Sequence, residues 1–162
     1  MYPIKDQNKN SAVELLNIST YWQNPPTTQK WRVRALRGAT TVSENSREAI
    51  ASAVSELIEA IEIHNRLDTE EIVSVTFSVT WDLNAIFPAA IARRRQGWED
   101  VPLLDVQHMY VENSLQKCIR VLIHFNTPLP KNQLRHVYLR DAAKLRPDLA
   151  LTQPHVTVGN RE

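Results

Sequence analysis

The sequence is short of several features, and each shortage excludes a class of protein. Cys118 is the single cysteine among 162 residues, so neither an intrachain disulfide nor a cysteine-rich zinc site can form. The three glycines leave no phosphate-binding loop. No segment approaches the roughly 18 apolar residues of a membrane span, and the polar start MYPIKDQNKN has no secretory hydrophobic region. We therefore expect a cytoplasmic protein.

An excess of charge of either sign is also missing. The chain has 19 basic and 18 acidic residues, which give a formal net charge of +1. General binding to nucleic acid or to a membrane surface requires a basic excess, so we expect neither partner. The five histidines show no spacing typical of metal ligands. We expect no metal and no cofactor.

The length fits one domain with a substantial core. Residues 1–30 are largely polar around one apolar patch, AVELLNISTYW, and contain a Pro25-Pro26 pair. We interpret residues 1–30 as an N-terminal arm, which either docks on the domain as a short helix or is mobile. Residues 31–152 are expected to form the domain, and residues 153–162 a C-terminal tail.

Hydrophobic periodicity predicts an α+β domain with a mixed sheet and two main helices. The first strand, in WRVRALRGATTV, is expected to end at a turn at Gly38. A long amphipathic helix follows in NSREAIASAVSELIEAIEIHNR, where Asn45 and Glu48 have the separation of a capping box. In FPAAIARRRQG, Pro88 suits a first helical turn and Gly97 a C-terminal cap, which predicts a second, shorter helix.

The remaining segments read mostly as strands. EIVSVTFSVT alternates apolar with polar residues and predicts a strand with one apolar face, made of Val73, Val75, Phe77 and Val79. VPLLDVQHMYV and KCIRVLIHFNT are typical of further strands. QLRHVYL fits either a strand or a helix, and DAAKLRPDL predicts a short helical turn closed by Pro147.

An arginine interrupts the apolar run KCIRVLIHF. Side chains alternate along a strand, so Cys118, Arg120, Leu122 and His124 share one face, and Ile119, Val121, Ile123 and Phe125 line the core face. Arginine keeps its charge in proteins, so an inward-pointing Arg120 requires an anion. The face carrying Arg120 is solvent-exposed, or paired internally, or the wall of a ligand pocket.

Arg37, like Arg120, lies beside strand positions where access of water should be poor. Two converging guanidinium groups would make a site for a dianion, because each binds a carboxylate through two hydrogen bonds. The run Arg93 to Arg95 is more typical of a solvated helix face. His108 and Asp105 could form an acid-base pair, although a separation of three residues places them on opposite faces of a strand unless a bulge intervenes. Cys118 has apolar neighbours and reads as a core residue.

Four stretches together resemble one family. RGATTV (37–42), DLNAIFPA (82–89), KCIRV (117–121) and RHVYLRDAAKLRPDL (135–149) are similar, in this order and spacing, to the AroH-type monofunctional chorismate mutases. The similarity covers roughly residues 31–152. It implies a trimer of mixed α/β subunits packed as a pseudo-α/β barrel, with active sites in the clefts between neighbours, and a small anionic substrate, chorismate.

The resemblance also implies roles for individual residues. Arg37 would bind a substrate carboxylate, and Arg120 would face the ether oxygen of chorismate. Tyr138 and Phe87 would help to enclose the ligand, with Arg93 supplied by the neighbouring helix. Leu145 and Arg146, in the last stretch, complete the substrate-binding set. The rearrangement to prephenate is an intramolecular pericyclic step that needs no acid, base, nucleophile or metal.

The departures from the family cluster on one strand. His108 stands where the family carries a glutamate that receives the ring hydroxyl of chorismate, and Asp105 stands where it carries a small residue. VENSL replaces a turn rich in glycine and proline, and Ala90 replaces an occasional lysine.

These departures leave three accounts open. Asp105 or a neutral His108 accepts the hydroxyl and mutase activity persists. Alternatively, the pocket serves another anionic substrate through Asp105 and His108, or the protein binds a partner without catalysis.

Overall fold

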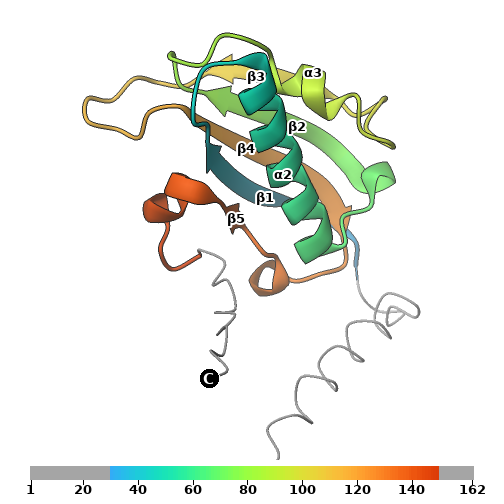
Figure 1. Ribbon diagram of the computed structural model, residues 1–162. Coiled ribbons are helices and arrows are strands. Elements are labelled where there is room, and N and C mark those ends of the chain that lie inside the picture. The colour runs from blue at the N-terminus through green and yellow to red at the C-terminus, as the bar shows by residue number, and fades with distance from the viewer. Residues whose placement is uncertain (1–29, 150–162) are drawn as a thin grey trace, which may run out of the picture.

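The computed structural model describes residues 30–149. They form a five-stranded mixed sheet in the order β3-β2-β4-β1-β5, with helix α2 lying across one face (Figure 1). The pairs β1·β4 and β2·β4 are antiparallel, and the pairs β1·β5 and β2·β3 are parallel. The predicted α+β class with a mixed sheet is confirmed. The arm assigned to residues 1–30, apart from Lys30, and the tail 153–162 lie outside the described residues.

Helix α2, Arg47–Asn65, provides most of the layer that covers the sheet. Its apolar residues recur every three or four positions, which places Ile50, Leu57 and Ile61 on one fully buried stripe. The predicted capping box is wrong by one residue. Ser46 is the N-cap, and its side chain accepts a hydrogen bond from the Ala49 amide. The side chain of Asn45 instead bonds to the loop after β2, through Asn84 and the Ala85 amide.

Strand β1, Arg32–Thr41, runs straight through Gly38, so the predicted turn there is wrong. Gly38 is required for close packing. A Cβ at this position would lie 2.8 Å from Ile61 Cδ1 and 3.0 Å from Val121 Cγ1. The absent side chain lets α2 approach the centre of the sheet, and β1 continues beyond it to pair with β5, Val137–Tyr138.

Strand β2, Ile72–Val79, contains a β-bulge that corrects one predicted core position. Ile72 pairs with Phe125 and Ser74 with His124, which leaves Val73 as an extra residue. Val73 is therefore exposed, whereas Val75 and Phe77 are buried as expected. The bulge keeps the remaining strand in register, so Ser74, Thr76 and Ser78 share the face opposite α2.

Strand β4, Cys118–Thr127, lies at the centre of the sheet and separates two different faces. The predicted core face is confirmed, because Ile119, Val121, Ile123 and Phe125 are all buried under the helices. The opposite face carries Arg120, Leu122 and His124, all half-buried. On that face the side chains of Val33 and Leu104 are 55% and 58% exposed. We call this second surface the open face.

The other elements are short. Helix α3, Pro88–Ala92, begins at Pro88 as predicted and packs beside α2. It ends at Ala92, well before Gly97, so the predicted C-terminal cap at Gly97 is wrong. Strand β3, Leu103–Gln107, forms one edge of the sheet. QLRHVYL, for which strand and helix were both open, contains β5. Three 3-10 turns, η1 (Thr69–Glu71), η2 (Lys131–Gln133) and η3 (Arg140–Leu145), complete the described chain, and η3 matches the predicted helical turn.

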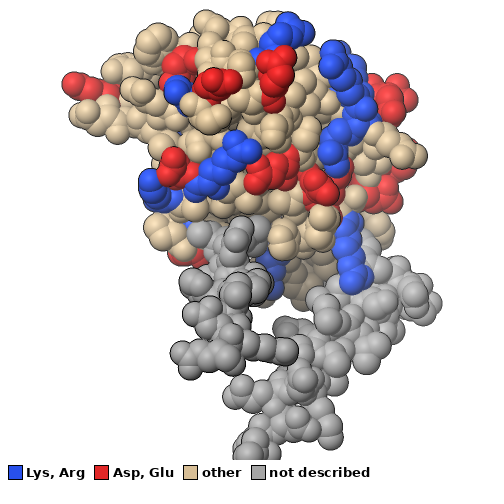
Figure 2. All heavy atoms as spheres, in the orientation of Figure 1, with Lys and Arg blue, Asp and Glu red and all other residues tan. Residues whose placement is uncertain are grey.

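On the helix-covered side, basic and acidic side chains are interspersed and form no broad patch of one sign (Figure 2). Among residues 30–149, no helix is long and apolar enough to cross a membrane.

Candidate active site

A cavity of about 540 Å³ opens on the open face between β1, β2, β4 and η3. Its volume falls within the range of roughly 300–1,000 Å³ typical of small-molecule sites. Three arginines and a tyrosine line it, and no carboxylate does. The lining residues are Arg37, Gly38, Ala39, Thr76, Ser78, Arg120, Val121, Leu122, Tyr138, Leu145 and Arg146.

Strand register explains how these residues meet. Arg120 of β4 pairs with Ser78 of β2 on one side and with Ala39 of β1 on the other, and Ala39 pairs with Tyr138 of β5. The row therefore runs across four strands on a single face. Ala39 is small, which leaves space between the Arg120 and Tyr138 side chains.

A second row lies two residues further along the strands. Arg37 of β1 pairs with Leu122 of β4, which pairs with Thr76 of β2. Arg37 and Arg120 are therefore diagonal neighbours on adjacent strands, about 7–8 Å apart in sheet geometry. Both long side chains can reach one ligand that carries two anionic groups.

Neither Arg37 nor Arg120 forms an ion pair with a carboxylate of the described residues, where four other pairs occur. The Nε atom of Arg120 is buried and has no hydrogen-bond partner there. A buried guanidinium N–H without an acceptor is costly. Of the three readings of Arg120 left open by the sequence, an internal ion pair is therefore excluded within residues 30–149, and the cavity makes Arg120 a pocket-wall residue.

The cavity is closed at one side by the segment after β5. Tyr138 is buried with Ala39 and Ala142, and η3 delivers Leu145 to the rim. Arg146 follows η3 and forms a two-pronged ion pair with Asp148, with Nε–Oδ1 at 2.9 Å and Nη2–Oδ2 at 2.7 Å. This exposed pair lowers the pKa of the Asp148 carboxyl, to which Arg37 also contributes.

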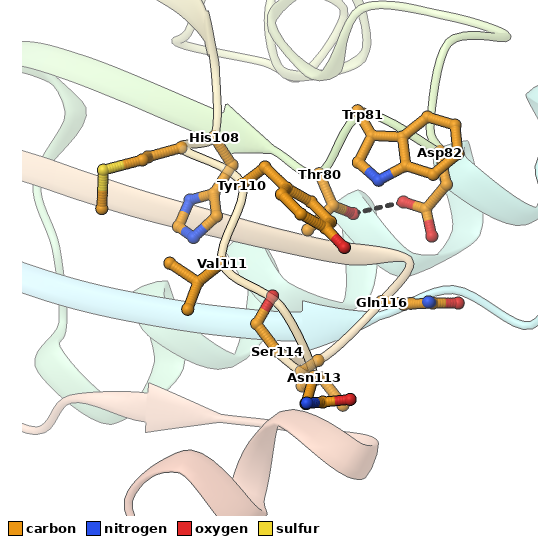
Figure 3. A pocket seen from close by; sticks show the side chains of 11 residues that line it. Thr80, Trp81, Asp82, His108, Tyr110, Val111, Asn113, Ser114 and Gln116 are labelled. Atoms are coloured by element: carbon orange, nitrogen blue, oxygen red, sulfur yellow. Dashed lines mark hydrogen bonds between the residues drawn. The ribbon is translucent and has the colours of Figure 1, made fainter.

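His108 adjoins this cavity from the end of β3. Its backbone N–H donates to Val79 O at 2.7 Å, and its Nδ1 lies 2.9 Å from Ser78 Oγ. Burial, and secondarily the nearby Arg120, lower the pKa of His108. The imidazole is therefore neutral at pH 7. His108 also lines a separate pocket of about 30 Å³, where it lies near Val111 and Tyr110 (Figure 3).

The side chains of Asp105 and His108 lie on opposite faces of the sheet. Asp105 pairs with Phe77 and so faces the helix layer, where its Oδ1 accepts a hydrogen bond from the Ala89 amide at 3.1 Å. Burial raises the pKa of Asp105, partly offset by that hydrogen bond and by Arg93. The opposite-face placement expected from the spacing holds, and the proposed pairing of Asp105 with His108 is absent from the described chain.

Phe87 and Arg93 also lie away from the cavity. Phe87 immediately precedes α3 and its side chain is 70% exposed, and Arg93 ends α3 and is exposed near Asp105. Cys118 is a buried free thiol whose pKa is raised by burial, which fits a core residue. No group of three or more potential metal ligands occurs within residues 30–149.

Sequence reasoning missed Ser78 and Thr76, which line the cavity beside the arginines. A signal was present, because the alternating Ser74, Thr76 and Ser78 of β2 share the face on which Arg120 lies. Pairing between β2 and β4 is a long-range property, and a single strand pattern does not reveal it.

Comparison with known proteins identifies the family. The family model described as Chorismate mutase type I matches residues 33–149. The chain is 43% identical over 121 residues to the protein named chorismate mutase AroH from Bacillus subtilis (strain 168), covering 75% of this chain and 95% of that protein. It is 46% identical over 122 residues to the chorismate mutase AroH from Thermus thermophilus, covering 75% of this chain and 99% of that protein.

A solved structure agrees with these matches. The chorismate mutase from Clostridium thermocellum superposes with a TM-score of 0.66 at 41% sequence identity, covering 68% of this chain and 98% of that chain. The sequence resemblance and the fold class are thereby confirmed. The chain belongs to the type I chorismate mutase family.

Proposed function

We propose that this protein is a chorismate mutase that rearranges chorismate to prephenate in the cavity on the open face. One observation carries the proposal. Arg37 and Arg120 lie diagonally on one sheet face, project into a cavity without carboxylates, and have no ion-pair partner in the described chain. Such a site requires an anionic ligand, and chorismate is a dicarboxylate.

The reaction fits a site without acid-base or nucleophilic machinery. A carbon–oxygen bond breaks and a carbon–carbon bond forms within one molecule, and no proton, leaving group or external electron pair is exchanged. Catalysis then consists of holding the reactive conformer and stabilising the negative charge that grows on the ether oxygen. Fixed cations in a partly buried cavity supply that stabilisation.

Arg37 binds a substrate carboxylate, and Arg120 faces the ether oxygen. The buried Nε of Arg120 supports this assignment, because a donor without a protein acceptor is available to the transition state. Tyr138, Leu145 and Arg146 close the cavity from the β5–η3 side. Substrate binding at Arg146 competes with Asp148 for the same guanidinium.

His108 takes the place of the family's glutamate as acceptor of the ring hydroxyl. The hydrogen bond between Ser78 and Nδ1 orients the ring, and the lowered pKa keeps it neutral. A neutral imidazole accepts a hydrogen bond but carries no negative charge to offset cationic character in the ring. We therefore propose a mutase with reduced turnover.

A neighbouring subunit completes the site. Phe87 and Arg93 lie away from the cavity of their own chain, and apolar side chains on the open face are exposed, among them Val33, Leu104 and Val106. These observations support the homotrimer that the family resemblance implies, with Phe87 and Arg93 entering a neighbour's cavity. The mass of the full chain in solution by light scattering tests this assembly: three copies support it, and a monomer overturns it.

The alternative of a diverged enzyme that uses Asp105 with His108 has no support from the geometry, since the two side chains face opposite sides of the sheet. Membership of the family gives a role in aromatic amino acid biosynthesis. We also propose that residues 31–152 are the catalytic domain and that the protein is cytoplasmic, where the free thiol of Cys118 would stay reduced.

A direct assay of the purified full chain tests the proposed activity. Chorismate consumption is followed with identification of the product. We expect prephenate at a rate far above the uncatalysed reaction. A folded, assembled protein that does not accelerate the reaction would contradict the proposal.

A further inference from the structure

His136 joins two strands that carry site residues. It immediately precedes β5, and the Arg37 backbone N–H donates a hydrogen bond to His136 Nδ1 at 3.1 Å. Strand β5 has only two residues, paired with Gly38 and Ala39 of β1. The His136 side chain thus adds one hydrogen bond to the very short parallel ladder between β1 and β5. The donor of this bond is Arg37, whose side chain lines the cavity.

The protonation state of His136 follows from this bond. A backbone N–H can only donate, so Nδ1 must carry a lone pair and the ring proton must reside on Nε2. Protonated imidazole has N–H groups at both positions and accepts nothing. The bond to Arg37 therefore exists only while His136 is neutral.

The surroundings of His136 are cationic. Together with His136, a second cavity of about 410 Å³ is lined by Arg34 and Arg37 of β1, His124 of β4 and Lys131 of η2, with no carboxylate in its wall. Burial, then Arg37, then Arg146 lower the pKa of His136 below its ordinary value of 6.5. Burial and the two arginines oppose protonation of His136, so the neutral ring predominates at pH 7.

We propose that His136 is a positioning residue whose neutral Nδ1 holds the Arg37 backbone beside β5, and so keeps Arg37 and Tyr138 in fixed places on the wall of the substrate cavity. This inference rests on the proposed function of that cavity. Arg37 lines both cavities, so a change at His136 affects substrate binding by moving Arg37.

The pH dependence has a definite sign. The pKa of His136 is lowered in the folded chain, so the contribution of the bond is fully present above pH 6.5. It is lost as the pH falls through the lower folded value. Acid therefore releases the Arg37 backbone without touching the guanidinium.

Hydrogen exchange at the Arg37 amide, measured on the full chain without ligand, tests the bond itself. We expect protection at pH 7 that falls about tenfold as His136 protonates, in line with the loss of one hydrogen bond. His136→Asn places a non-titrating oxygen acceptor near the position of Nδ1 and should keep protection into the acidic range. His136→Phe removes the acceptor and should lose protection at every pH.

Kinetics with chorismate give a second readout. Arg37 binds a carboxylate similarly in substrate and transition state, so His136→Phe should raise KM about three- to tenfold with a smaller change in kcat. His136→Asn should restore KM and remove its rise in acid. If His136→Phe does not fold, the pH dependence in the parent and in His136→Asn decides.

The outcomes separate this inference from the proposed function. If hydrogen-exchange protection of the Arg37 amide changes neither with pH nor in His136→Phe, the positioning role is overturned, whether or not chorismate is turned over. Protection that follows His136 in a protein without mutase activity supports the bond and overturns only the function of the cavity.

Discussion

Each face of the sheet carries a half-buried arginine, and only the arginine on the helix-covered face has an ion-pair partner in the described chain. Under the helices, Arg95 Nη2 lies 2.5 Å from Glu62 Oε2, while the fully buried Trp98 donates to Glu62 Oε1 at 2.7 Å. On the open face, Arg120 has no ion pair within the described chain. The Nε atoms of Arg95 and Arg120 both lack an acceptor among residues 30–149, so the two arginines differ in the ion pair.

This difference separates stability from function. A charge with an internal partner contributes to holding the fold together, whereas a buried charge without one lowers stability and persists where a ligand supplies the partner. On this account the helix face keeps the sheet rigid, and that rigidity preorganises the open face for an anion. The comparison predicts that removing the Arg120 charge on the open face lowers activity. Breaking the Arg95–Glu62 ion pair on the helix face instead lowers stability.

The largest expected effect comes from Arg120→Met, which removes the charge but keeps much of the apolar stem. We expect kcat/KM for chorismate to fall on the order of 10³-fold, because the growing charge on the ether oxygen loses its cation. Steady-state kinetics measure this. Arg47→Ala, which removes an exposed arginine at the start of α2, is the control and should leave kcat/KM within about twofold of the parent. A loss below about tenfold for Arg120→Met would remove Arg120 from the reaction.

Glu62→Ala probes the other face. It leaves Arg95 and the Trp98 indole N–H without their acceptor, so the free energy of unfolding should fall by about 2–4 kcal/mol. Denaturant titration measures the loss, and Glu62→Gln should lose less, because one amide oxygen still accepts. At a temperature where the variant is folded, kcat should match the parent. A marked fall in kcat with little change in stability would reverse the assignment of the two faces.

His108 sharpens the description of the open face. His108→Glu supplies a negative acceptor and should raise kcat about three- to tenfold, since one charge-assisted hydrogen bond replaces a neutral one. In the parent, the pKa of His108 is lowered, so kcat should hold at pH 6.5 and fall as the pH drops through the lower value.

His108→Gln, which does not titrate, is the matched control for the pH profile and should lose that acid limb in kcat. Unchanged turnover in His108→Glu, in a protein that folds and assembles, would show that the reaction does not depend on an acceptor at this position.

Asp105 gives the smallest effect and belongs to the helix face. Its pKa is raised by burial, so ionisation costs stability as the pH rises through the folded value. Asp105→Asn keeps the acceptor for the Ala89 amide and removes the charge. We expect a gain in unfolding free energy below about 1 kcal/mol at pH 7, and none near pH 3. A gain that persists at pH 3 would mean that the carboxylate charge is not the cause.

The sequence predicted which sheet face Arg120 takes better than it predicted local backbone geometry. Alternation in β4 was enough to put Arg120 opposite the core, because one pattern of eight residues determines both faces. Gly38 was misread as a turn, because its role is to admit the Ile61 side chain of α2, and that contact is invisible in a single segment. Val73 was misplaced for a similar reason, since a bulge depends on the partner strand.

The relation between Asp105 and His108 was the hardest to obtain from the sequence. Spacing alone indicated opposite faces, and their joint departure from the family left a pair open as one of three accounts. The structure separates them: Asp105 bonds to the start of α3 and His108 to Ser78. Substitutions that occur together in one segment do not establish contact, whereas strand parity does predict which face each side chain takes.

The unfolding free energy of Arg120→Met, measured against the parent without ligand, tests the central claim most directly. If the partner of Arg120 is the substrate, the variant should be as stable as the parent or more stable by about 1 kcal/mol, because a buried, unpaired charge has been removed. A loss of about 3 kcal/mol would contradict the account, since it would mean that Arg120 already has an anionic partner within the protein.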